Sequence, residues 1–462
     1  MIAWLKQARQ RNKEIEEKGG LLFSNEALRK LIIPLTIEQM LTMAVGLVSV
    51  MMVSHAGEAA VSGVSLVTML NAFFIFLFGA IATGGAVVIS QYIGKGDQEN
   101  GCYAASQLVT TSLLLSTGLM LFVLVFRQHL LNLLFGGVEA DVMAASLTFF
   151  VITAYSYPFL AMHSVGASLF RSMGRANVTM YVAIVMNVIN LVGSAVAIFV
   201  LEAGIFGIAL ANLASRVAAA LIMAVMSYNE KNQVYIRIRQ ILSIRLDMVK
   251  LILKVAVPSS VESGLFQLSR IFLLSIIATF GTAQIVANGV ANSIDFFGAM
   301  VVMSMNMAIV TVVGQCVGAG DFEQAKYYVR KLMKYSFIGS AAVNLAVIAL
   351  LPLILNLFYL SDEARELSFT LVVIHNVFII FFGGLAFPMA GAIRAAGDVK
   401  FAMLVVVVAT AVFRVFFSFV FGVWMGLGII GVWIAMVLDW GIRGLLFGWR
   451  YRSGKWMEYK LV

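Results

Sequence analysis

Long apolar runs, separated by short charged or glycine-rich segments, make up most of the chain from residue 29 to residue 449. A helix needs about 20 apolar residues to cross roughly 30 Å of hydrocarbon. Twelve runs reach that length and predict transmembrane helices at 29–53, 60–92, 103–126, 141–165, 175–200, 204–228, 251–279, 284–315, 326–358, 366–390, 399–423 and 428–449. The runs at 60–92 and 284–315 are longer than a bilayer requires, which predicts tilted helices or irregular ends.

The second half of the chain repeats short motifs of the first half. PLTIE begins at residue 34 and PSSVE at residue 258, which is 224 positions later. At the same spacing QYIGKGD (91–97) matches QCVGAGD (315–321) and GIFG (204–207) matches GIIG (428–431), while FRSMGRANV (170–178) matches IRAAGDVKF (393–401) at a spacing of 223. Since six is an even number of crossings, two copies of a six-helix unit enter the membrane from the same side and form parallel repeats.

This pattern predicts an all-α integral membrane protein with twelve transmembrane helices in two parallel six-helix repeats. The expected parts are a cytoplasmic N-terminal arm at 1–28, an N-lobe at 29–228, a cytoplasmic linker at 229–250, a C-lobe at 251–450 and a cytoplasmic tail at 451–462.

Composition and charge agree with a membrane protein. Hydrophobic residues make up 61% of the chain and charged residues only 12%, which excludes an ordinary soluble domain. The net charge of +9 does not require nucleic acid, because most of the 32 Lys and Arg fall in segments on one side of the predicted spans. The segments on the other side keep only Arg127 and Arg365. The positive-inside rule then places both termini in the cytoplasm of a multi-pass protein in the plasma (inner) membrane.

A charged side chain inside the bilayer costs at least ~2.5 kcal/mol and needs a partner, water or a function. Counting from the turns puts Arg270 and Asp295 at similar depth, and likewise Arg414 and Asp439, with Arg443 following Asp439 at i+4. We interpret these five as structural ion pairs, and Asp295 is also a candidate for ion coupling.

The glutamates of PLTIE and PSSVE differ from those pairs. Glu38 and Glu262 each lie eight residues inside the last basic residue, and neither has a cation at i+3 or i+4. One interpretation is a carboxylate near the start of a helix kinked by Pro34 or Pro258. The other, which we favour, is a proton, Na⁺ or cation site.

No spacing in the chain indicates an enzyme. Cys102 and Cys316 form no metal-binding or redox motif. The histidines are far apart in the sequence and none has a neighbouring acid or cysteine: His55, His129, His163 and His375. The IGKGD and VGAGD segments lack the Lys-Ser/Thr ending of a phosphate-binding loop and are expected to be tight turns.

Taken together, the two parallel repeats, QYIGKGD, GQCVGAGD, FRSMGRANV and IRAAGDVKF resemble the multidrug and toxic compound extrusion (MATE) family, in a bacterial branch, over about residues 26–450. The resemblance implies a V-shaped two-lobe transporter that exports organic cations, drugs or toxic metabolites in exchange for Na⁺ or H⁺. It also implies that Glu262 matches a coupling glutamate of the seventh helix, where Na⁺ can bind, and that Glu38 is its counterpart in the first lobe.

The first lobe departs from the family's pattern. Ser49, and Ser194 four residues after Asn190, stand where members with a first-lobe cation site have aspartates. We therefore expect a polar substrate cleft or ion site remade around Glu38, with Asn71, Asn187, Asn190 and Arg216 as its lining.

The hypothesis from sequence is a secondary active antiporter that works by alternating access as a monomer. Its expected substrate is a small, cationic, amphipathic molecule, with membrane lipid around it and no cofactor beyond the coupling ion. The alternative within the same superfamily is a flippase or exporter of a lipid-linked glycan, and an intramembrane enzyme or receptor is a third hypothesis.

Overall fold

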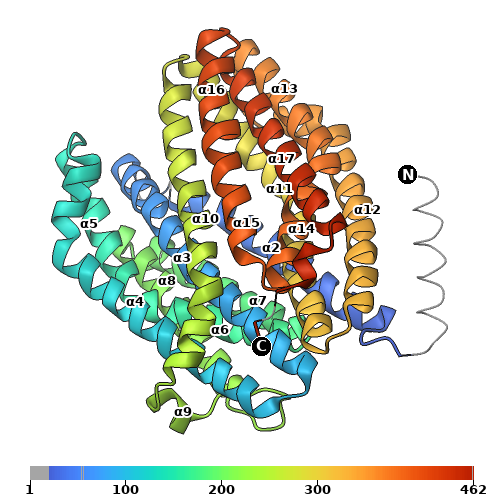
Figure 1. The fold of residues 1–462 in the computed structure, drawn as a ribbon. Coiled ribbons are helices and arrows are strands. Elements are labelled where there is room, and N and C mark those ends of the chain that lie inside the picture. Colours follow the sequence, from blue (N-terminus) through green and yellow to red (C-terminus); the bar gives the residue numbers. More distant parts are fainter. Residues whose placement is uncertain (1–19, 54, 56, 460) are drawn as a thin grey trace. The chain divides into compact units, whose positions relative to one another are not determined.

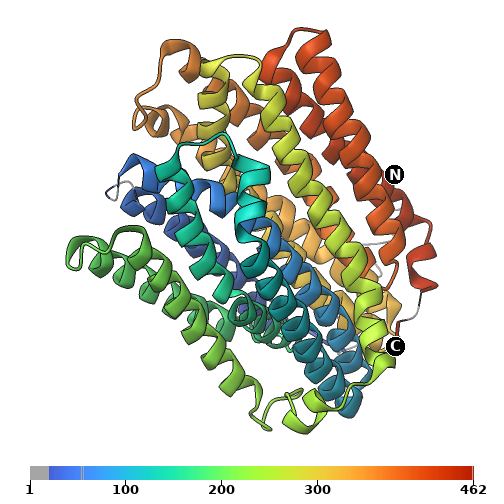
Figure 2. The same cartoon turned by 90° about the vertical axis from the view of Figure 1, so that its left-hand side faces the viewer.

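The computed structural model describes residues 20–462 apart from residues 54, 56 and 460, and in that part the chain is helical (Figure 1, Figure 2). Most of the predicted N-terminal arm therefore lies outside the described residues. The first repeat contains α2 (Asn25–Val53), α3 (Glu58–Lys95), α4 (Gln98–Phe135), α5 (Ala140–Tyr155), α6 (Tyr157–Ser172), α7 (Ala176–Phe199) and α8 (Gly204–Ser227).

The linker between the repeats holds the short helix α9 (Ile238–Leu242). The second repeat contains α10 (Leu246–Ala278), α11 (Thr282–Gly318), α12 (Phe322–Leu355), α13 (Asp362–Phe378), α14 (Gly384–Ala395), α15 (Val399–Val408), α16 (Phe417–Phe419) and α17 (Gly428–Arg452). π-helical turns at Ile379–Gly383, Ala409–Phe416 and Val420–Trp424 join α13 to α14 and continue α15 through α16, and a 3₁₀ turn at Lys455–Met457 follows α17.

Every predicted span falls on one of these helices or continuous helical segments. Within the described residues, ten are long and apolar enough to cross a membrane, and the bent pair α5 and α6 makes an eleventh. The helix α2, which carries Arg29, Lys30 and Glu38, completes the set of twelve. Several predicted spans stop at charged residues and are therefore too short. Helices such as α4 and α6 continue through Arg127 and Arg171.

The fourth span of each repeat is irregular at the same place. In the first repeat α5 and α6 meet at an angle of 48°, at Ser156 and directly before Pro158. Proline has no N–H, so one main-chain carbonyl in the preceding turn loses its helical hydrogen bond. In the second repeat a π-helical turn at Ile379–Gly383 occupies the corresponding place.

The backbone confirms the internal repeat independently of the motifs. Glycines with positive φ recur at spacings of 224 or 223, and each pair has a similar backbone role at a helix end: Gly57 (φ 100°) and Gly281 (104°), Gly96 (75°) and Gly320 (74°), Gly174 (73°) and Gly397 (104°), Gly204 (52°) and Gly428 (56°). Because only glycine adopts this conformation without strain, the chain reverses direction at the same points in both copies.

The two motifs QYIGKGD and QCVGAGD pack against each other. A side chain at Gly94 would collide with the main-chain carbonyl of Gln315, and one at Gly318 would collide with that of Gln91. The side chain of Gln91 also donates to the main-chain oxygen of Ala395 at 2.7 Å. These segments are therefore helix ends in close backbone contact, in agreement with the expectation of turns rather than phosphate loops.

Contacts divide the chain into two compact units that do not coincide fully with the repeats. One unit holds Pro34–Ile89 and Gln98–Gln267, and the other holds Ser90–Asp97 and Leu268–Val462 together with the described residues up to Ile33. The first part of α10 thus belongs with the helices of the first repeat, where Ala256 packs against Gly84 of α3. The lobe boundaries expected from the sequence stay a prediction.

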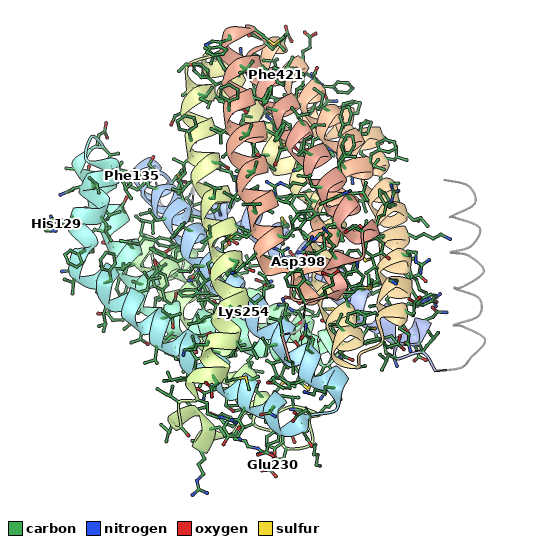
Figure 3. The ribbon with its side chains drawn as sticks, in the orientation of Figure 1. His129, Phe135, Glu230, Lys254, Asp398 and Phe421 are labelled. Carbon is green, nitrogen blue, oxygen red and sulfur yellow. The ribbon has the colours of Figure 1, made fainter. Side chains whose placement is uncertain are left out.

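Polar contacts tie the linker helix and the last helix to their neighbours within each unit. In the first unit, Gln107 of α4 donates to the main-chain oxygens of Gln240 and Ser243, so the linker helix α9 is tied to α4. In the second unit, Nε of Arg450 donates to Oδ2 of Asp398 at 2.7 Å, which joins α17 to the turn before α15 (Asp398 is labelled in Figure 3).

Candidate ion-coupling site

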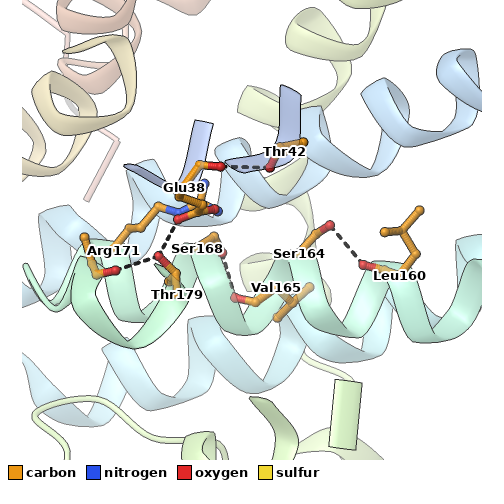
Figure 4. Close-up of polar contacts among 9 residues, drawn as sticks. Glu38, Thr42, Leu160, Ser164, Val165, Ser168, Arg171 and Thr179 are labelled. Atoms are coloured by element: carbon orange, nitrogen blue, oxygen red, sulfur yellow. Dashed lines mark hydrogen bonds and ion pairs between the residues drawn. The ribbon is translucent and has the colours of Figure 1, made fainter. Parts of the chain in front are cut away.

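Glu38 lies in a polar cluster formed by three helices of the first repeat. Nη2 of Arg171 in α6 is 3.1 Å from Oε1 of Glu38, and the hydroxyl of Thr179 in α7 donates to Oε2 at 2.7 Å (Figure 4). Each carboxylate oxygen therefore has its own donor. The hydroxyl of Thr42, one turn further along α2, donates to the main-chain oxygen of Glu38 at 2.9 Å.

Because the ion pair of Glu38 and Arg171 is largely buried, the charge of Glu38 depends on its bound partners. The side chain of Glu38 is 8% exposed and that of Arg171 is 20% exposed. A carboxylate removed from water is stable as an anion only while its partners stay in place. A proton or a cation that binds Glu38 would therefore compete with Arg171 for the same charge.

Glu262 occupies the corresponding position in α10, four residues after Pro258, which also lies inside its helix. Taken as whole residues, Glu262 and Glu38 are both 6% exposed. Both glutamates fall in the same compact unit, because the first part of α10 groups with the first repeat. Two residues beyond Glu262, the ring of Phe73 lies 3.5 Å from the position that a Cβ of Gly264 would take.

The asparagine predicted in α3 forms a closed hydrogen-bond set. Asn71 accepts a hydrogen bond from the hydroxyl of Tyr157 at 2.7 Å and donates to Oγ1 of Thr153 at 3.3 Å. Arg216 of α8 donates to Oγ of Ser156 at 2.6 Å, so this arginine has a neutral partner at the bend between α5 and α6. These hydrogen bonds connect α3 and α8 to the bend between α5 and α6.

The other predicted lining residues are placed as follows. Ser194 donates to Oδ1 of Asn190 at 3.2 Å within α7. Asn187, one turn earlier, is 9% exposed, and its Nδ2 has no hydrogen-bond partner among the described residues. Ser49 is half-buried in α2. The structure gives no contact that joins Glu38 to Asn187 or Asn190.

In the second repeat Asp439 holds two arginines. Nε of Arg443 is 2.7 Å from Oδ1 of Asp439 on the same helix, and Nη1 of Arg414 is 3.7 Å from Oδ2. Arg443 also donates to Oγ1 of Thr410 at 2.8 Å. Asp439 has no exposed surface, which fits a structural role for this cluster.

The predicted partner of Asp295 is wrong. Nδ1 of His375 lies 3.1 Å from Oδ1 of Asp295, and Nδ2 of Asn376 donates to the same oxygen at 3.2 Å. Arg270 is an exposed residue of α10 and forms no ion pair with Asp295. Counting residues gave a similar depth for the two, but depth does not fix the face of the helix on which a side chain lies. His375 thus has an acidic neighbour that its sequence surroundings do not show.

A sequence model of one protein family matches both repeats. The MatE model covers residues 34–196 and again residues 258–420, and the second match starts 224 positions after the first. The matches begin at the two prolines, Pro34 and Pro258, that precede the buried glutamates. The chain belongs to the MatE family.

Relatives of this MatE protein match it over almost its whole length. It is 24% identical over 431 residues to "Uncharacterized transporter YisQ" of Bacillus subtilis (strain 168), which covers 92% of this chain and 93% of the relative. It is 27% identical over 436 residues to "Probable multidrug resistance protein NorM" of Rhizobium meliloti (strain 1021), with 91% of each covered. It is 24% identical to a protein of the same name from Thermotoga maritima, with 93% of this chain and 92% of the relative covered.

Solved structures share the MatE fold. "Crystal structure of MATE in complex with MaL6" matches with a TM-score of 0.86 and 22% identity, over 94% of this chain and 97% of that one. A Pyrococcus furiosus structure, "Reverse polarity of binding pocket suggests different function of a MOP superfamily transporter", matches with a TM-score of 0.85 and 22% identity, over 94% and 96%. The protein is thus an all-α membrane transporter of two six-helix repeats, in a family of multidrug efflux proteins.

Sequence reasoning missed the donors around the acids in this MatE chain. Arg171 falls outside the predicted span 141–165, whereas α6 continues to Ser172 and keeps Arg171 on the helix. The contact of Asp295 with His375 does have a signal in the sequence. The two residues lie equally far from the starts of their helices, Thr282 and Asp362, and therefore at similar depth. Nothing in the sequence pattern indicates the contact of Thr179 with Glu38.

Proposed function

We propose that the protein is a secondary active antiporter that exports organic cations, drugs or toxic metabolites in exchange for Na⁺ or H⁺. The observation that carries this proposal is the buried carboxylate of Glu38, held by Arg171 and Thr179 in a helix that contains Pro34. Ionisable residues inside a membrane are costly, and in transporters they mark ion and substrate pathways. Glu262, equally buried, is the second coupling carboxylate in the proposal.

The geometry supports coupling by competition. When Glu38 is ionised, the carboxylate fixes Arg171 of α6 and Thr179 of α7 relative to α2. A proton or Na⁺ on Glu38 replaces part of that attraction and weakens the link between these helices. An ion with different affinities for the linked and unlinked arrangements shifts the equilibrium between them, which is the requirement for alternating access.

The arginines inside the membrane favour a cationic substrate over a lipid-linked glycan. Export of a glycan carried on phosphate calls for unpaired cationic side chains, whereas Arg414 and Arg443 are held by Asp439. Arg216 is bound to the neutral hydroxyl of Ser156 and Arg270 is exposed on α10, so only these two arginines are left for the glycan alternative. The buried acids Glu38 and Glu262 instead offer negative charge, which attracts organic cations.

The remaining parts of the proposal follow from the charge distribution and the repeat. Both termini lie in the cytoplasm and the protein resides in the plasma membrane, in accord with the positive-inside rule. A single chain with two repeats forms a pathway by itself, so the proposed working unit is the monomer. The coupling ion is the only additional component that the proposed cycle requires.

A transport assay in proteoliposomes tests this function. A fluorescent organic cation is loaded, and an inward Na⁺ gradient, an inward H⁺ gradient or no gradient is imposed. The proposal predicts uphill export under at least one gradient and none without a gradient. Movement of a lipid-linked glycan without any response to the organic cation would instead support the flippase.

A further inference from the structure

The linker between the repeats carries four exposed apolar side chains. Ile238 and Leu242 of α9 are 62% and 82% exposed, and Ile244 and Leu246, which follow, are 55% and 66% exposed. We call these four residues the linker face. They lie ahead of the predicted span 251–279, where exposed apolar residues are not explained by a membrane-crossing segment. Apolar surface that is gathered in one place favours association with another apolar phase, so the linker face calls for a partner.

The helix α9 turns its polar side to the protein and its apolar side away from it. Gln240 is 6% exposed, and its Oε1 accepts a hydrogen bond from the hydroxyl of Ser106 in α4 at 3.3 Å. Since an α-helix turns about 100° per residue, Ile238 and Leu242 each lie about 160° around the axis from Gln240. A helix at a purely aqueous surface has the opposite arrangement, with its apolar side packed on the protein. The outward side of α9 therefore suits a neighbour that is not water alone.

Hydrogen bonds hold α9 beside the beginning of the membrane-crossing part of α4. The hydroxyl of Thr110 donates to the main-chain oxygen of Ile241 at 2.9 Å, and the main-chain nitrogen of Arg245 donates to Oε1 of Gln107 at 3.1 Å. Both α4 residues lie within the predicted span 103–126. The linker face thus lies at the depth where hydrocarbon meets the headgroups, next to the start of α10 (Figure 1).

Basic side chains border the linker face. Arg239 is exposed and has no hydrogen bond or ion pair within the described part of the chain. Arg245, also exposed, lies between Ile244 and Leu246 in the sequence, with its guanidinium 4.7 Å from the ring centroid of Tyr103. The linker at 229–250 contains five basic and only two acidic residues. This positive charge beside apolar side chains is complementary to an anionic headgroup above its acyl chains.

We propose that the linker face, with Arg239 and Arg245 beside it, binds anionic phospholipids of the cytoplasmic leaflet, where the proposed topology places the linker. The apolar side chains enter the boundary between headgroups and acyl chains, and the guanidinium groups bind lipid phosphates. Because α10 begins at Leu246, the bound lipids hold the start of the helix that carries Pro258 and Glu262. This inference goes beyond the proposed function and does not depend on antiport, because lipid binding requires no transport.

Quenching of a fluorophore on the linker face by lipids tests this proposal in the full chain. The native cysteines, Cys102 and Cys316, are both buried, so bimane attaches to the thiol introduced by Leu242→Cys, and the wild type is the labelling control. The labelled protein is reconstituted in phosphatidylcholine and phosphatidylglycerol, one of which carries brominated acyl chains. We expect both lipids to quench, with phosphatidylglycerol preferred by roughly fivefold or more at equal mole fraction.

Arg239→Gln in the labelled protein should lower this preference by roughly fivefold, because one cationic side chain at the linker face is lost. Lys231→Gln is the matched control, since it removes an exposed positive charge from the same linker outside the face, and it should keep the preference. Absence of quenching by either lipid would overturn the proposal and show that water or another protein surface covers the face. Equal quenching by the two lipids, or equal effects of Arg239→Gln and Lys231→Gln, would overturn the assignment to anionic headgroups.

Discussion

Glu38 of α2 and Arg171 of α6 form an ion pair inside the first repeat, with 3.1 Å between Oε1 and Nη2. The pair joins two motifs that the sequence presents separately, PLTIE and FRSMGRANV. Thr179 of α7 supplies the second donor, so one carboxylate connects three helices. Loss of any one of these groups has a different expected consequence, which makes the cluster open to experiment.

Replacing Arg171 by alanine leaves Glu38 buried with Thr179 as its remaining side-chain donor. An isolated buried charge is strongly destabilising, so we expect a loss of about 2–4 kcal/mol, lowered from the fully buried case because Arg171 is 20% exposed. Thermal unfolding of the purified protein measures the change. Arg175→Ala, which removes an exposed arginine that contacts Oδ1 of Asn232 and lies over the ring of Phe170, is the control and should cost much less. Equal losses in the two variants would contradict a special role for the ion pair.

Gly94→Ala should destabilise the protein, because the new methyl group meets the main-chain carbonyl of Gln315 and a backbone cannot move aside as a flexible side chain can. Overpacking of this kind costs about 1–3 kcal/mol. Gly79→Ala in the same helix meets nothing within 4 Å and should be neutral or slightly stabilising. Thermal unfolding compares the two variants. A Gly94→Ala variant as stable as Gly79→Ala would show that the two motifs do not pack as the structure has them.

Asp439→Asn should destabilise the second repeat, since it leaves Arg443 and Arg414 buried without their shared carboxylate. The expected loss is about 3–5 kcal/mol. Asp141→Asn, an exposed acid in the first turn of α5, serves as control with an expected loss of about 0.5 kcal/mol. The measurement is thermal unfolding or the yield of monodisperse protein. A mild effect of Asp439→Asn would argue that the arginines reach water.

Tyr157→Phe removes the donor to Oδ1 of Asn71 and should cost about 1 kcal/mol. Because Tyr157 directly follows the bend at Ser156, we also expect a modest change in transport rate. Tyr155→Phe, at a side chain that is 48% exposed, is the neighbouring control and should leave stability unchanged. Unfolding experiments that give the same stability for both variants would rule out the hydrogen-bond set as a determinant of the bend.

Much of the fold followed from hydrophobic run lengths and from the repeat. The spacings of 224 and 223 placed both copies of every motif, and glycines such as Gly96 and Gly320 adopt nearly equal φ angles of 75° and 74°. Run lengths suffice for this because a span must cross a fixed thickness of hydrocarbon. The ends of helices were less predictable, since charged residues such as Arg171 continue a helix beyond the apolar run.

The candidate site was predicted less completely because depth alone does not determine contacts. Residue counting placed Arg270 and Asp295 at similar depth, but rotation about the helix axis turned Asp295 towards His375. The contact of Asp439 with Arg443 could be predicted from the sequence, because Arg443 follows at i+4, a spacing that fixes the helix face as well as the depth. Asn376, which donates to Asp295, was not singled out from the sequence, because its position in the apolar run does not show which acid it faces.

In the proposed function, Glu38 couples an ion gradient to export. The most direct measurement compares wild type and Glu38→Gln in proteoliposomes, under the driving gradient and in gradient-free exchange of a labelled organic cation. We predict that Glu38→Gln loses gradient-driven uphill export while it keeps passive exchange, since glutamine keeps the shape of the side chain but cannot take up a proton or balance a cation. Full gradient-driven export by Glu38→Gln, at the wild-type ratio of ion to substrate, would contradict the account.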